Sequence, residues 1–115
     1  MKDKKYQGLL DTIKYLIDLE KEQLKRVSGT VDYIISTNYQ DVNDIEHVFD
    51  RMLDLGFIPA EELSIPYFKL LDYVRPLDSE SASAYEGFFI EKYNEDIIVE
   101  NPKIIKIAKD HDNRQ

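Results

Sequence analysis

The segment YQGLLDTIKYLIDLEKEQLKRVSGTVDYI, residues 6–34, contains apolar residues separated by alternating steps of three and four. The series is Tyr6, Leu10, Ile13, Ile17, Leu24, Val27, Val31 and Ile34, with one polar place at Glu20. Leu9 and Leu16 widen the stripe to about three positions in seven, which is typical of a helix packed into a globular bundle. The segment therefore predicts a long amphipathic helix with one broad apolar face.

The length of this first helix depends on Ser28-Gly29. We predict a helix from Lys4 to Arg26 that runs on to Thr37 if Ser28-Gly29 does not kink or break it, since a helical glycine costs about 1 kcal/mol. Unbroken, the helix would be about 50 Å long. Such a helix is too long for a compact domain of this size unless it pairs with another chain, so a homodimer through the long first helix is one expectation.

The second helix is the best signalled in the chain. Apolar residues with a helical period run from Val42 to Leu55, and Asp41 stands before them as an N-cap. Gly56 is in the place of a left-handed C′ residue, and Pro59 follows it. We therefore predict a helix over residues 42–55 that ends at Gly56.

Proline positions define the later elements. We predict one short turn over residues 59–63, then a third helix with Pro66 in its first turn, where the missing amide is not needed, and with Pro76 at its end. Asp78 is the expected cap of a fourth helix from Ser79 to Tyr93.

The C-terminal residues predict one more short helix. Asn101-Pro102 is a favourable start for a helix over Pro102–Lys109. The β-branched run Ile97–Val99 is compatible with two interpretations, an extended segment or an anchor for a loop. Because no alternating strand pairs or hairpin turns occur, the expected fold is an all-α bundle of four to five helices without a sheet. Residues 1–110 form a single domain in this interpretation, and residues 111–115 form a polar tail.

Charge is concentrated in the middle of the chain. Residues 40–100 contain 15 acidic and four basic residues, whereas the whole chain has a net charge of −8. A negative field of this kind repels nucleic acid and attracts basic proteins. Cysteine is absent, no segment has the length of a membrane span, and the usage of Lys, Ile, Asp, Asn and Tyr is typical of an AT-rich bacterium or its phage. We therefore expect a cytoplasmic protein with a basic protein partner and with no direct contact to nucleic acid or membrane.

Residue patterns for catalysis are sparse. His47 has Asp44 and Asp50 three residues away on either side, a spacing that suits a metal or an acid–base pair but is also common on solvated helices. Carboxylates at helical spacing are a feature of all-α NTP-pyrophosphohydrolases that bind Mg²⁺, yet the paired Glu-Glu-x-x-Glu pattern of that family is missing. We expect no catalytic residue, no metal site and no cofactor.

Residues 42–59, VNDIEHVFDRMLDLGFIP, resemble the second helix of a pentatricopeptide-type repeat at Phe49, Met52, Gly56 and Pro59. The resemblance implies an αα-hairpin and, in that family, RNA binding. The local negative charge opposes RNA binding, and we interpret the match as convergence on helix-packing residues.

Aromatic side chains crowd into the third and fourth helices, where they serve either a compact core or a binding surface. The predicted partner-binding surface combines acidic residues with one tyrosine, and its members are Asp44, Glu46, Asp50, Asp54, Asp72, Tyr73, Glu86 and Glu91. The leading hypothesis is a non-catalytic acidic interaction module, such as a small inhibitor or immunity-type protein. The alternatives are a Mg²⁺-dependent helical enzyme of the NTP-pyrophosphohydrolase type and an oligomeric structural or regulatory bundle.

Overall fold

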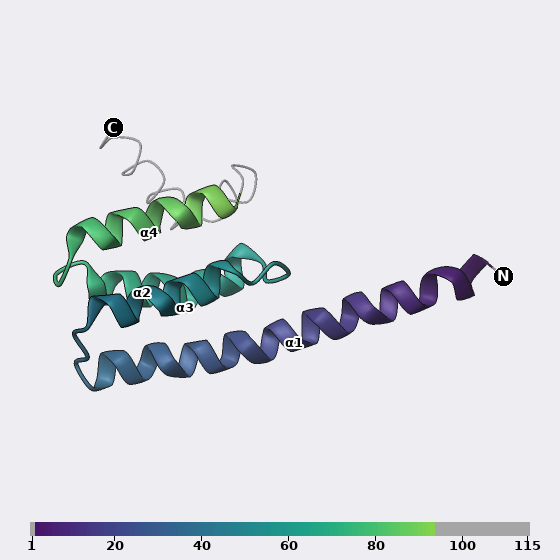
Figure 1. Ribbon diagram of the computed structural model, residues 1–115, viewed down its shortest axis with the longest axis horizontal. Coiled ribbons are helices and arrows are strands. Elements are labelled where there is room, and N and C mark those ends of the chain that lie inside the picture. The colour runs from purple at the N-terminus through teal and green to yellow at the C-terminus, as the bar shows by residue number, and fades with distance from the viewer. Residues whose placement is uncertain (1, 94–115) are drawn as a thin grey trace.

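The computed structural model of the protein describes residues 2–93, with side chains from Tyr6 onward (Figure 1). Its helices are α1 (Lys2–Ser36), α2 (Val42–Leu53), α3 (Ala60–Val74) and α4 (Ser79–Lys92). No strand occurs within residues 2–93, and the predicted all-α bundle with a long first helix is confirmed. The predictions for Ile97–Val99, for a helix over Pro102–Lys109 and for a polar tail at residues 111–115 lie outside the described residues.

Helix α1 is continuous from Lys2 to Ser36, so the break considered at Ser28-Gly29 does not occur. Val27 and Val31, on either side of the glycine, are both buried against the bundle. Their burial offsets the roughly 1 kcal/mol that a helical glycine costs. The helix ends at Ser36, seven residues after Gly29, and Asn38 then adopts a left-handed conformation with φ of 55°.

Two predicted N-caps are confirmed. The Asp41 side chain accepts a hydrogen bond from the Asp44 amide at 3.3 Å, and Asp78 accepts one from the Ser81 amide at 3.1 Å. Each carboxylate satisfies one of the free amides of a first helical turn. These caps fix where α2 and α4 begin.

The predicted left-handed conformation at Gly56 is wrong, because none of the described glycines has a positive φ. Helix α2 ends two residues earlier than expected, with Asp54 as its C-cap. The amides of Gly56 and Phe57 instead donate to the carboxylate of Glu20, at 3.0 and 2.7 Å. The one polar place in the apolar stripe of α1 therefore holds the α2–α3 loop against α1.

The prediction that Pro66 lies in the first turn of the third helix is also wrong. Helix α3 begins at Ala60 and runs through Pro66, so the expected short turn over residues 59–63 is its first turn. The missing Pro66 amide leaves the Glu62 carbonyl without its usual helical partner. Glu62 is exposed, so water can bond to this carbonyl, while the Pro66 ring is buried in the core.

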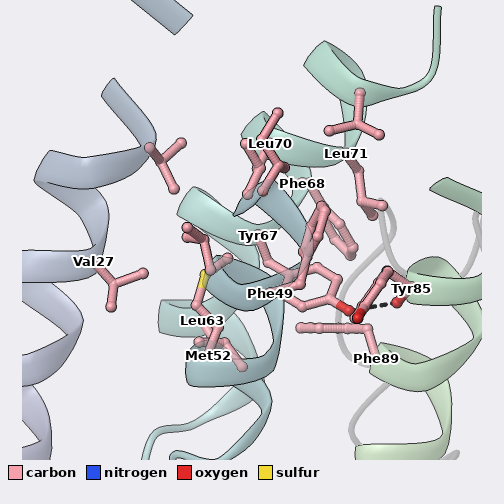
Figure 2. Packing of buried hydrophobic residues seen from close by; sticks show 14 of the residues in the cluster. Val27, Phe49, Met52, Leu63, Tyr67, Phe68, Leu70, Leu71, Tyr85 and Phe89 are labelled. Atoms are coloured by element: carbon pink, nitrogen blue, oxygen red, sulfur yellow. Dashed lines mark hydrogen bonds between the residues drawn. The ribbon is translucent and has the colours of Figure 1, made fainter. Parts of the chain in front are cut away.

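The core is aromatic (Figure 2). Phe49 of α2 stacks on Tyr85 of α4, with ring centroids 4.7 Å apart, and meets Tyr67 of α3 edge-on at 5.0 Å. The Tyr67 hydroxyl donates to the main-chain carbonyl of Tyr85 at 2.5 Å. Of the aromatic residues of α3, α4 and the α4 C-cap, the core therefore buries Tyr67, Phe68, Tyr85, Phe89 and Tyr93, whereas Phe88 is 44% exposed.

The two halves of α1 have different surroundings. Figure 1 shows its C-terminal half alongside α2 and α3, while its N-terminal half extends beyond them. Lys69 of α3 forms an ion pair with Asp32 in the C-terminal half. The bundle therefore consists of α2, α3, α4 and the second half of α1.

Candidate partner-binding surface

Three carboxylates follow the outer side of α2 at intervals of four residues: Glu46, Asp50 and Asp54. They face away from the core because Ile45, Phe49 and Met52, on the opposite side of the helix, are fully buried. Asp50 and Asp54 are exposed and Glu46 is half-buried. We call these three residues the acidic ridge.

Helix α4 holds two members of the ridge in place. The Tyr85 hydroxyl donates to Asp50 Oδ1 at 2.8 Å, and the Ser81 hydroxyl lies 3.0 Å from Glu46 Oε2. The same Ser81 oxygen lies 3.1 Å from Asp78 Oδ2. Since a serine hydroxyl has a single hydrogen, it can donate to only one of these two carboxylates at a time. Glu46 and Asp78 therefore compete for one hydroxyl hydrogen.

Hydrogen bonds and burial at the α2–α4 edge shift the pKa values of Asp78 and Tyr85 in opposite directions. The Ser81 amide and hydroxyl hold the pKa of Asp78 below its usual range. Burial, the hydrogen bond to Asp50 and the negative charges of Asp50 and Glu46 raise the pKa of Tyr85 well above its ordinary value. Tyr85 therefore remains a hydrogen-bond donor to Asp50 at neutral pH.

Asp54 lies on the other side of the ridge, next to α1. It lines an open surface groove of about 390 Å³ together with Gln23, Arg26, Val27, Arg51 and Leu55. Two arginines share this groove with one carboxylate, so the strongly negative part of the surface is centred on Glu46 and Asp50 rather than on Asp54.

Other exposed acids of the predicted surface lie apart from this edge. Asp44 is at the first turn of α2, where the Tyr39 hydroxyl donates to it, and this hydrogen bond raises the pKa of Tyr39. Asp72 is exposed on α3 and Glu91 is exposed on α4. The acids therefore occupy several helices and are brought together with α4 side chains only at Glu46 and Asp50.

Two predicted members do not lie open to a partner. Glu86 is 3% exposed and forms an ion pair with Arg75 at 2.7 Å, so its place on an exposed surface is a wrong prediction. Tyr73 is half-buried, and its hydroxyl donates to the Tyr39 carbonyl at 2.6 Å. The ion pair joins the end of α3 to α4, and Tyr73 holds the α1–α2 connection.

Sequence reasoning missed Asp78, Ser81 and Tyr85 as neighbours of the ridge. It assigned Asp78 to a helix cap, which is confirmed. The aromatic residues of the third and fourth helices were left open between core and surface, and Tyr85 is one of those that the core buries. The proximity to α2 had no local signal, because Ser81 and Glu46 are 35 residues apart in the chain.

His47 is exposed on α2. Within the described part of the chain, no three His, Asp or Glu side chains are grouped so that they could hold a metal ion. The geometric condition for the Mg²⁺-dependent alternative, three converging carboxylates, is therefore not met by these residues.

Comparison with known proteins does not assign the chain to a family. No family model matches it, and no significant match was found among curated proteins or solved structures. Within residues 2–93, none of the helices combines the length and apolar character needed to cross a membrane.

Proposed function

We propose that this protein is a non-catalytic interaction module that binds a basic protein through the acidic ridge on α2. The observation that carries the proposal is the α2–α4 edge, where the Tyr85 hydroxyl donates to Asp50 and the Ser81 hydroxyl, shared with Asp78, lies 3.0 Å from Glu46. Among the described residues, both ion pairs use other carboxylates, Asp32 and Glu86. Glu46 and Asp50 therefore present carboxylates that form neither of these ion pairs, whereas Asp54 shares its groove with Arg26 and Arg51.

Fixed carboxylates suit a basic partner for two reasons. An ionised carboxylate has about four acceptor sites and can accept two parallel hydrogen bonds from one arginine. The contacts from α4 involve one oxygen of Asp50 and one of Glu46, which leaves further acceptor sites on each carboxylate. Because the Asp50 side chain is already ordered by Tyr85, less conformational entropy is lost from it when a partner binds.

Overall charge supports the same proposal. Residues 41–93 contain 12 acidic and four basic residues, and the whole chain has a net charge of −8. A field of this sign increases the rate at which basic proteins associate. Small size and strong negative charge fit a bacterial or phage-encoded inhibitor or immunity-type protein that neutralises a basic effector in the bacterial cytoplasm.

The proposal is tested by capture of partners from the native host with matched charge variants. Wild-type protein, the double variant Glu46→Gln/Asp50→Asn and the control Asp72→Asn/Glu91→Gln would each be immobilised, and bound proteins identified by mass spectrometry. The control removes the same charge from exposed positions outside the ridge. We expect a basic protein that binds to the wild type and to the control and is lost from the ridge variant.

Salt dependence provides the second readout. The dissociation constant of the captured partner should rise steeply as ionic strength increases from about 0.01 to 0.15 M, since screening shortens the reach of charges from about 30 to 8 Å. Equal capture by all three forms, or an affinity that does not change with salt, would contradict binding through the ridge.

A further inference from the structure

The N-terminal half of α1 exposes the apolar face that its C-terminal half buries. Tyr6, Leu9 and Leu10 are 58, 59 and 57% exposed, whereas Val27 and Val31 on the same stripe are 7 and 0% exposed. We call residues 6–19 the arm. Figure 1 shows the arm extending beyond α2, α3 and α4.

The boundary between the two halves is Glu20. Its carboxylate accepts the Gly56 and Phe57 amides, so the α2–α3 loop meets α1 at this residue. The apolar stripe continues past this point without changing side, from Leu24 through Ile17 and Ile13 to Tyr6. The arm therefore has a packing surface of the same kind as the bundle half, with none of α2, α3 or α4 extending over it.

We propose that the arm pairs with the arm of a second copy of this chain, antiparallel and about a two-fold axis between residues 11 and 12. The stripe residues Tyr6, Leu10, Ile13 and Ile17 are separated by steps of four, three and four. This spacing reads the same in both directions, as a two-fold interface requires, because the same patch must meet itself. Pairing brings Leu10 opposite Ile13 of the other copy and Tyr6 opposite Ile17.

The flanking positions select the antiparallel direction. One edge of the stripe carries Leu9 and Leu16, and the other carries Gln7 and Lys14. Parallel helices would place the leucine edge of one arm against the lysine edge of the other. Antiparallel helices place Leu9 beside Leu16 of the second copy and leave both polar edges in solvent.

Charge favours the same arrangement. Two bundles that each carry the strongly acidic residues 41–93 repel each other, and antiparallel arms place them at opposite ends of the pair. An arm of 14 residues spans about 21 Å, which exceeds the screening length of about 8 Å at physiological salt.

The first test is the mass of the full chain in solution, measured by light scattering and sedimentation over a range of concentrations. We expect a dimer of twice 13.5 kDa. Leu10→Glu/Ile13→Glu places charges in the centre of the apolar interface and should weaken dimerisation by at least about 100-fold, or about 2.8 kcal/mol at 1.4 kcal/mol per factor of ten. The matched control is Tyr15→Glu, a residue of the arm that is 65% exposed and lies off the stripe, and it should leave the dimer intact.

Circular dichroism of each variant would verify that the bundle remains folded, because the arm residues lie outside it. A wild type that is monomeric at every concentration would overturn the proposal, and the partner of the arm would then have to be sought elsewhere than in a second copy. A dimer that resists Leu10→Glu/Ile13→Glu would overturn it as well.

The second test measures the direction of the pair. The chain has no cysteine, so Lys14→Cys and Lys25→Cys each introduce a single site for a spin label. Antiparallel arms place the two labels at residue 25 about 40 Å apart along the axis and those at residue 14 about 8 Å apart along it. Parallel arms would give short distances at both positions, and that result would overturn the antiparallel arrangement.

Discussion

The two halves of α1 share one helix and one apolar stripe but lie in different surroundings. In the bundle half, Val27, Val31 and Ile34 are at most 7% exposed. In the arm, Tyr6, Leu9 and Leu10 are all more than half exposed. The difference teaches that a helical apolar pattern identifies the face that is suited to burial, whereas the rest of the fold decides which part of that face the chain itself covers.

This difference has an energetic consequence. Isolated helices shorter than about 12–15 residues are marginal in water, and the arm is of that length. The bundle half gains stability from packing against α2 and α3, where Lys69 also pairs with Asp32. The arm has no such support within the bundle, so its helix should be firmly formed only when a second arm covers it.

The largest expected effect compares a core truncation with an arm truncation. Phe49 is fully buried against Tyr67 and Tyr85, so Phe49→Ala should lower the free energy of unfolding by about 3–5 kcal/mol. Leu10→Ala should change it by less than about 0.5 kcal/mol when the protein is dilute enough to be monomeric. Urea unfolding followed by circular dichroism measures both values, and similar losses at the two positions would show that the arm belongs to the cooperative core.

Alkaline pH should destabilise the bundle through Tyr67. Burial raises the pKa of the Tyr67 phenol far above its ordinary value of 10.0, so the folded chain keeps a proton that the unfolded chain loses. This contribution is complete below pH 10 and declines as pH rises above it, by up to about 1.4 kcal/mol per pH unit. Urea unfolding at pH 8 to 11.5 would follow the decline.

Two phenylalanine variants locate the source of this pH dependence. Tyr67→Phe should make the decline above pH 10 less steep without abolishing it, because burial also raises the pKa values of Tyr85 and Tyr93. It should lower stability at pH 8 by about 1 kcal/mol because the hydrogen bond to the Tyr85 carbonyl is lost. Tyr15→Phe in the arm should leave the curve unchanged. An equally steep decline in Tyr67→Phe would assign it to other groups.

Local features of the fold could be predicted from the sequence, because their causes lie within a few residues. Asp41 and Asp78 cap the helices that follow them, and Ile45, Phe49 and Met52 occupy the buried side of α2. Helical period and capping act within one or two turns. These signals were sufficient for the all-α class and for three of the four helix starts to within two residues.

Features that depend on distant residues could not be predicted in this way. Glu20 takes the amides of residues 56 and 57, which lie 36 and 37 positions later, and this contact replaces the expected left-handed glycine. Glu86 was expected on a surface because glutamate is seldom buried unless it is paired, and Arg75 supplies that pairing. The ridge was predicted as acidic, but its contacts with Ser81 and Tyr85 arise only when α4 packs beside α2.

The boundary residue Glu20 offers an intermediate effect. Glu20→Ala removes the acceptor for the Gly56 and Phe57 amides and should lower the free energy of unfolding by about 1–2 kcal/mol, because hydrogen bonds to charged groups at a partly exposed site are worth about that much. Glu22→Ala, an exposed neighbour, is the control. Hydrogen exchange should also become faster in the α2–α3 loop of Glu20→Ala alone, and unchanged exchange there would contradict its anchoring role.

The smallest expected effect uses a glycine from each half of α1. A Cβ added at Gly8 or at Gly29 would meet no atom within 4 Å, so alanine fits at both positions. Gly29→Ala should raise the free energy of unfolding by about 0.5–1 kcal/mol, because alanine loses less backbone entropy in a helix. Gly8→Ala should increase helix content without stabilising the monomeric bundle, since the arm is outside it, and should strengthen the dimer because less ordering remains to be done on pairing. Equal stabilisation of the monomer by both variants would mean that the arm and the bundle unfold as one unit.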